Sequence, residues 1–152
     1  LKYKSNYKDV SHIISIHMTK QIFINLPVDN VEKSMHFYVE LGFTVNPEFT
    51  DENQKCMVWS DHIYIMLQSQ NMFRSYIKKQ MPDQKAYQSA SYTLPVESYE
   101  KINAIMEGGL KAGGTEPISM IDEGFMQVRT IEDLDGHTWG FIHLDMKKFR
   151  NR

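Results

Sequence analysis

A near-repeat of eight residues constrains the fold of this 152-residue chain most strongly. The run LPVDNVEK over 26–33 returns as LPVESYEK over 94–101, an offset of 68 residues (from 26 to 94). Each copy leads into a stretch with apolar residues at helical spacing, and glycines follow both stretches. An internal repeat indicates a duplicated structural unit. We therefore expect two related modules, with a binding site where equivalent strands face each other.

Around each copy, the pattern of apolar residues and turn signals predicts one helix and four strands. Two βαβββ modules predict an α+β fold. We expect their strands to form one curved, eight-stranded mixed sheet around a concave cleft, with the helices outside. The predicted strands are 21–27, 43–45, 55–60 and 62–68 in the first module, and 89–95, 117–119, 125–131 and 138–144 in the second. The predicted divisions are a non-essential extension over 1–17, module 1 over 18–68, a connector with a short helix over 69–86, module 2 over 87–146, and a solvated basic tail over 147–152.

Composition narrows the class of function. The formal net charge of −2 gives no basic footprint for nucleic acid. No apolar run reaches the roughly 20 residues needed to span a bilayer, so we expect no membrane partner. The single cysteine, Cys56, cannot form an internal disulfide, which is typical of a protein in the reducing cytoplasm. Its apolar neighbours predict a buried structural thiol.

Several motifs carry a resemblance to a known family. Asn25-Leu26-Pro27-Val28, Phe37-Tyr38 and Leu41-Gly42-Phe43 in the first half resemble the opening of a vicinal oxygen chelate module. The run EDLDGHTW over 132–139 resembles the aspartate- and glycine-containing turn of the same superfamily, with Leu134 in place of proline. This superfamily includes glyoxalase I, bleomycin resistance proteins and extradiol dioxygenases. Within it, the chain is most similar to bacterial proteins labelled predicted lactoylglutathione lyase.

The resemblance implies a two-module fold but argues against the family's metal chemistry. Metal-using members take four His, Glu or Gln ligands from the first and last strand of each module. Carried over to this chain, those positions fall on Phe23, Met66, Ser91 and Gly140. None of these four residue types serves as a ligand at such a site. We therefore expect no metal and no other cofactor; a divalent metal is expected only if a displaced site exists.

Strand alternation predicts which side chains line the cleft. The mixture of aromatic, sulfur and hydroxyl groups is suited to a small amphipathic or aromatic molecule. An alternative is that these residues pack on each other or on a partner subunit. The predicted lining is Phe23, Asn25, Tyr64, Met66, Gln68, Ser89, Ser91, Thr93, Thr138, Gly140 and Ile142.

Two further side chains are candidates for binding. Arg129 could clamp an anionic ligand, although a strand arginine is more often a surface residue. Trp59 could stack on a ligand, although the alternative is a core tryptophan. His62 and His137 occupy equivalent turns of the two modules, where a structural role is the usual one.

Three functions are consistent with these observations. The first is a metal-free binding protein for a small organic molecule, which sequesters it as bleomycin resistance proteins do; the resemblance implies a homodimer. The second is a lactoylglutathione-lyase-like lyase or isomerase with a displaced metal site or none. The third is a structural or regulatory module that has no small ligand and no catalytic residues.

Overall fold

The structure is a computed structural model that describes residues 20–152. The predicted N-terminal extension, residues 1–17, lies outside the described residues. Module 1 contains one helix, four strands and a 3-10 turn: β1 (Ile22–Val28), α1 (Val31–Glu40), β2 (Thr44–Asn46), the turn Pro47–Phe49, β3 (Gln54–Ser60) and β4 (Ile63–Ser69). The connector carries α2 (Gln70–Ser75). Module 2 and the C-terminus comprise β5 (Ser91–Pro95), α3 (Tyr99–Lys111), β6 (Ile121–Asp122), β7 (Met126–Glu132), β8 (Thr138–Leu144) and α4 (Met146–Arg150).

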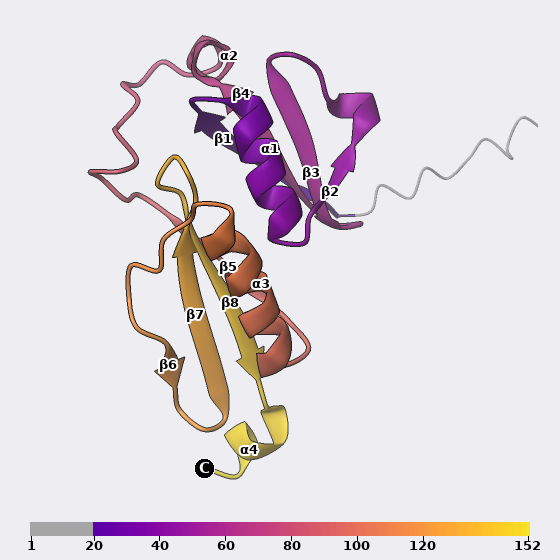
Figure 1. The fold of residues 1–152 in the computed structure, drawn as a ribbon, viewed down its shortest axis with the longest axis vertical. Helices are drawn as coiled ribbons and strands as arrows, with labels where there is room; N and C mark the ends of the chain where they lie inside the picture. The colour runs from indigo at the N-terminus through magenta and orange to yellow at the C-terminus, as the bar shows by residue number, and fades with distance from the viewer. Residues whose placement is uncertain (1–19) are drawn as a thin grey trace, which may run out of the picture.

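The α+β fold class and the two βαβββ modules are confirmed. The strand orders are β1-β4-β3-β2 and β5-β8-β7-β6, and in each sheet the first and last strands of the module pair in parallel. The prediction of one continuous eight-stranded sheet is wrong, because the strands form two separate four-stranded sheets. Figure 1 shows the two modules end to end, joined by the connector. Alternation identifies strands and their faces, but it carries no information about which sheet edges meet.

The repeated phrase encodes the same local structure twice. In each module it ends a strand and places a capping side chain before a helix. The Asn30 side chain accepts a hydrogen bond from the backbone N–H of Lys33, and the equivalent Ser98 accepts one from Lys101. A short side-chain oxygen at this position satisfies an N–H that has no partner within the helix. This repeated cap explains why both helices begin at equivalent residues.

One hydrophobic core runs through both modules on the helix-covered side of the sheets. Trp139 of module 2 lies at its centre and is fully buried. Its ring centroid is 5.9 Å from that of Tyr38 and 5.8 Å from that of Phe43, both in module 1. Gly109 on α3 permits this close approach. A Cβ atom there would lie 2.6 Å from the Leu41 side chain of module 1.

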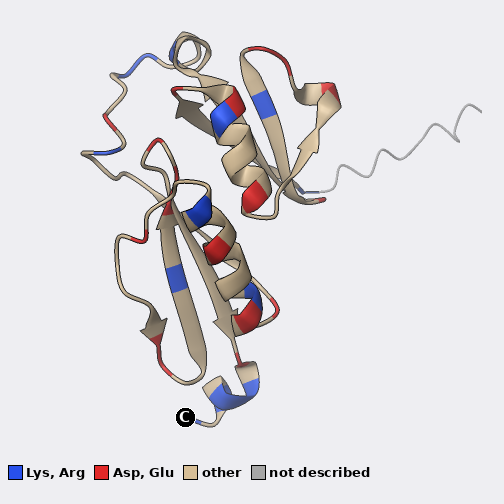
Figure 2. Ribbon diagram, in the orientation of Figure 1, with Lys and Arg blue, Asp and Glu red and all other residues tan. Residues whose placement is uncertain are grey.

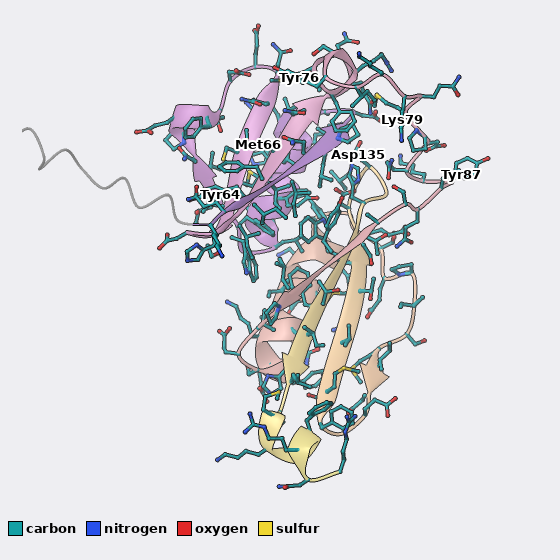
Figure 3. All side chains as sticks on the ribbon, turned by 180° about the vertical axis from the view of Figure 1, so that it is seen from behind. Tyr64, Met66, Tyr76, Lys79, Tyr87 and Asp135 are labelled. Atoms are coloured by element: carbon teal, nitrogen blue, oxygen red, sulfur yellow. The ribbon has the colours of Figure 1, made fainter. Side chains whose placement is uncertain are left out.

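A turn of module 2 fastens the modules at the N-terminus of α1. The Asp135 carboxylate accepts hydrogen bonds from the Asp29 N–H at 2.8 Å and from the Ser34 hydroxyl at 3.1 Å. His137 donates from Nε2 to the carbonyl oxygen of Pro27 at 2.7 Å. The aspartate-glycine turn named in the resemblance is therefore an inter-module contact. Figure 3 labels Asp135 at this junction.

Two sequence predictions at the edges of module 2 are wrong. Residues 117–119 form no strand; the edge strand β6 is Ile121–Asp122, since Pro117 lacks an N–H for pairing. The basic tail is not a solvated terminus. Asp145 caps α4, and the Arg152 guanidinium lies 3.7 Å from the centroid of the Phe149 ring. Figure 2 shows the basic residues of α4 at the end of module 2.

Candidate functional site

The concave face of module 1 is the sheet surface opposite α1. Register pairs Phe23 with Tyr64 and Asn25 with Met66, so these four side chains share that face. The Phe23 and Tyr64 rings are stacked, with centroids 4.7 Å apart and planes 12° apart. Figure 3 shows Tyr64 and Met66 on this sheet, with Tyr76 next to its far end. All four belong to the predicted cleft lining.

A cavity of about 540 Å³ lies over this face, beneath the start of the connector. Its volume is within the range of pockets that hold small organic molecules, about 300–1,000 Å³. Two carboxamides and three apolar or aromatic side chains line it, and none of these carries a charge. The Tyr76 side chain is 72% exposed and stands at the mouth. The lining residues are Asn25, Gln68, Phe73, Tyr76 and Ile77.

The short helix α2 forms one wall of this cavity. It begins directly after β4, where the Ser69 hydroxyl accepts a hydrogen bond from the Met72 N–H. This cap turns the chain back over the sheet, so Phe73 and Ile77 reach the concave face. The apolar stripe of this segment is visible in the sequence, but the sequence gives no direction for the helix. Reasoning from strands alone therefore missed Phe73, Tyr76 and Ile77 as site residues.

A narrower cavity of about 190 Å³ continues from the first one toward module 2. The two share Asn25, Phe73 and Ile77. Beyond them, the second cavity is lined by Tyr92 and His137 of module 2, as well as by connector residues. A ligand on the module 1 face could therefore extend as far as the module junction.

The concave face of module 2 carries a cavity of its own, about 200 Å³ in volume. Register places Ser91 beside Thr138 and Thr93 beside Gly140 on this face. The lining residues of this cavity and of the module 1 cavity are entirely different. The prediction of one cleft shared by both modules is therefore wrong for the single chain. The separate sheets place the two sets of side chains in two pockets.

Trp59 does not lie in either concave cavity, and its predicted place is wrong. Its ring centroid is 5.0 Å from that of Phe43 and 5.9 Å from that of Phe141, so it packs at the helix-side core. A β-bulge between Val58 and Ser60 interrupts the register at this point. The alternative interpretation of Trp59 as a core residue agrees with the structure.

Arg129 is also misplaced by the prediction. It pairs with Phe141, whose side chain lies on the helix side of the module 2 sheet. Its guanidinium donates to both Glu116 carboxylate oxygens, at 2.9 and 2.7 Å, and to the Asn103 carbonyl oxygen. The hydrogen bond from Arg129 lowers the pKa of Glu116 below its ordinary value. The charge of this arginine is thus already paired, on the face away from the cavities.

The remaining chemistry-bearing side chains have structural surroundings. His62 lies in an exposed turn, where Nδ1 is 3.1 Å from the carbonyl oxygen of Lys20. The equivalent His137 is buried and fastens the modules. Cys56 is fully buried, and burial raises the pKa of its thiol. A thiol with a raised pKa carries little thiolate, so Cys56 is a poor nucleophile.

The residues at the family's metal positions do not fit a divalent metal. Phe23 and Gly140 provide no donor atom, and Met66 and Ser91 do not belong to the His, Glu and Gln set. Moreover, a Cβ atom at position 140 would lie 3.0 Å from the Thr93 hydroxyl oxygen. Within residues 20–152, no three His, Cys, Asp or Glu side chains converge in a way that could hold a metal ion. No reaction step through a metal is derived for this chain.

Comparisons with known proteins agree with this architecture. Residues 20–60 match the family model described as bleomycin resistance protein-like N-terminal. No curated protein matches the sequence of the chain. None of the helices within residues 20–152 is both long and apolar enough to cross a membrane.

Solved structures with the same fold come from several bacteria. A hypothetical protein from S. aureus has a TM-score of 0.70 and 21% identity, covering 83% of this chain and 94% of that one. A glyoxalase-related enzyme from Fulvimarina pelagi has a TM-score of 0.69 and 18% identity, covering 82% and 88%. A glyoxalase/bleomycin resistance protein/dioxygenase family enzyme from Burkholderia phytofirmans PsJN has a TM-score of 0.68 and 9% identity, covering 83% and 99%.

These likenesses establish the fold. The chain has the two-module fold of the glyoxalase, bleomycin resistance and dioxygenase proteins, which is the vicinal oxygen chelate superfamily. The resemblance noted in the sequence is thereby confirmed. Because one fold hosts many activities, the function must be argued from the site.

Proposed function

We propose that the protein binds a small, uncharged, amphipathic or aromatic molecule in the module 1 cavity, without a metal. The observation that carries this proposal is the lining of that cavity. Asn25 and Gln68 offer carboxamide donors and acceptors, while Phe73 and Ile77 offer apolar surface. A charged ligand would find no opposite charge there and would lose hydration without compensation.

Binding without catalysis is the activity that these groups support. The cavity contains neither a nucleophile beside a base nor a carboxylate to move a proton. Sequestration of a small molecule, rather than its conversion, is therefore the proposed role. A lactoylglutathione-lyase-like activity is not proposed, because the metal positions hold no suitable donors.

Two further features belong to the same proposal. The concave faces of both modules are open in the single chain, and we propose a homodimer that covers them. The single Cys56 also supports a reducing compartment such as the cytoplasm. Light scattering coupled to size-exclusion chromatography tests the dimer: a mass of twice 17.8 kDa is expected, and a monomer at all concentrations would contradict it.

Calorimetric titration with indole-3-carboxamide tests the binding site. This probe is uncharged and combines an aromatic ring with a carboxamide; indole-3-carboxylate is its charged counterpart. We expect the amide to bind more tightly than the carboxylate. We further expect Asn25→Leu to weaken amide binding by about tenfold, which corresponds to one hydrogen bond of about 1.4 kcal/mol.

Asn71→Leu is the matched control, because Asn71 is exposed on α2 and does not line the cavity. The control variant should bind the amide as the wild type does. Equal binding by the Asn25 and Asn71 variants would contradict the assignment of the site. Tighter binding of the carboxylate than of the amide would contradict the proposed class of ligand.

A further inference from the structure

We propose that the concave face of module 2 is a second binding site, for a small uncharged polyol of about monosaccharide size. This proposal does not depend on the module 1 cavity, because the two cavities have no lining residue in common. Its centre is Thr138, at the start of β8. Its walls come from β5, β7 and the segment that precedes β6.

The Thr138 hydroxyl provides the first observation. The Thr138 residue is 6% exposed, and its Oγ1 atom has no hydrogen-bond partner within the described residues. Leaving a buried hydroxyl unpaired costs about 1–3 kcal/mol, so such groups are rare without a role. Because Thr138 lines the cavity, a bound molecule can reach the hydroxyl and complete its hydrogen bonding.

Other hydroxyl side chains surround this unpaired group. Ser91 and Thr93 on β5 and Thr130 on β7 line the same cavity as Thr138. Each hydroxyl can donate one hydrogen bond and accept others. The hydroxyl groups of a polyol have the same dual capacity, so donors and acceptors can be matched at several points. An apolar ligand would leave the Thr138 hydroxyl unpaired.

The floor of the cavity is kept open by a glycine. Gly140 is buried beside Thr93, and a Cβ atom there would approach the Thr93 hydroxyl oxygen to 3.0 Å. Any side chain at this position would therefore press on Thr93 and take up space in the cavity. The absence of a side chain at the family's fourth metal position thus has a consequence: it leaves room for a ligand.

The size and charge of the cavity define the ligand class. Its volume of about 200 Å³ equals that of roughly seven water molecules at about 30 Å³ each. No charged side chain lines it, so a charged ligand would be desolvated without compensation. Val128 and Ile118 add apolar surface, against which the C–H groups of a polyol can pack.

Methyl NMR of the full chain, labelled at threonine and isoleucine methyl groups, tests the proposal with D-xylose as the probe. We expect D-xylose to shift the methyl signals of Thr138 and Thr130 in a saturable way, while D-xylonate, its carboxylate counterpart, binds at least tenfold more weakly. No saturable shift with D-xylose, or tighter binding of D-xylonate, would overturn the proposal.

Thr138→Val separates binding from folding, because valine preserves the shape of threonine and removes the hydroxyl. We expect this variant to bind D-xylose at least tenfold more weakly while its Tm stays the same or rises. A lower Tm together with unchanged D-xylose binding would show that the hydroxyl serves the fold, and would overturn the proposal. Thr44→Val, on the exposed strand β2, is the matched control and should bind as the wild type does.

Two further measurements distinguish this site from other uses of the same face. Asn25→Leu should leave the D-xylose shifts unchanged, so a failure of the module 1 proposal would not imply a failure here. If the same threonine signals move with protein concentration in the absence of D-xylose, and D-xylose no longer moves them, the face belongs to a subunit interface. That result would overturn the proposal.

Discussion

Replacing Tyr38 with phenylalanine tests how the two modules are held together. Tyr38 is fully buried on α1 of module 1, and its hydroxyl donates to the Asp133 carboxylate of module 2 at 2.7 Å. The same oxygen accepts a hydrogen bond from the Trp139 indole N–H at 2.9 Å. Tyr38→Phe would remove both interactions and leave the indole N–H buried without an acceptor.

The magnitude follows from these two losses. A hydrogen bond to a charged group contributes about 1.5–3 kcal/mol, and an orphaned buried donor costs about 1–3 kcal/mol. Because the Asp133 carboxylate keeps the N–H groups of Asp135 and His137 as donors, we expect a net loss of roughly 3 kcal/mol. At about 2–4 °C per kcal/mol for a chain of this size, Tm should fall by roughly 10 °C.

Differential scanning calorimetry measures this loss, with Tyr92→Phe as the control. Tyr92 packs on the same indole ring, with centroids 4.9 Å apart, but no hydrogen bond of its hydroxyl is found within residues 20–152. The control should therefore change Tm by about 2 °C or less. Equal effects of the two substitutions would refute the claim that this hydrogen-bonded network joins the modules.

The pH dependence provides a second test of Tyr38. Burial, together with the charge of Asp133, raises the pKa of Tyr38 well above its ordinary value of 10.0. A group whose pKa is raised in the folded state contributes stability below its unfolded pKa and loses it as pH rises further. Stability should therefore fall above about pH 10 in the wild type, and less steeply in Tyr38→Phe.

Three further predictions concern the module contacts. Gly109→Ala should lower the free energy of unfolding by about 1–3 kcal/mol through overpacking, measured by urea unfolding against the exposed Glu107→Ala as control; an unchanged value would contradict the close approach. Burial raises the pKa of Asp135, so its ionisation disfavours the fold, and Asp135→Asn should gain stability relative to the wild type as pH rises from 4 to 7. The Arg129 hydrogen bond lowers the pKa of Glu116, so the stability that this pair contributes should be lost in acid; Glu116→Gln should cost about 1 kcal/mol or less at pH 7 and nothing near pH 2.

The duplicated phrase allowed the modules, their helices and most strands to be predicted, because capping and alternation are local properties of the chain. Face assignments from alternation agree with the register for Phe23, Asn25, Tyr64 and Met66. The relation between the modules could not be predicted in this way. It depends on long-range contacts such as Asp135 with Ser34, which no local pattern encodes.

The site residues show the same division. Parity counted along the chain fails for Trp59, since a β-bulge shifts the register beside it. Arg129 lies on the helix side because its partner is Glu116, 13 residues away, on a segment that was expected to form a strand. The unpaired hydroxyl of Thr138 is a property of packing, so only coordinates reveal it.

The central claim is that the module 1 cavity binds an uncharged aromatic molecule without a metal. The most direct test is methionine methyl NMR of chelator-treated protein, titrated with indole-3-carboxamide. The account predicts a saturable shift of Met66, on the concave face, and none of Met57, which is buried on the opposite side of the sheet. A Met66 shift that requires added nickel or zinc, or no shift under either condition, would contradict the account.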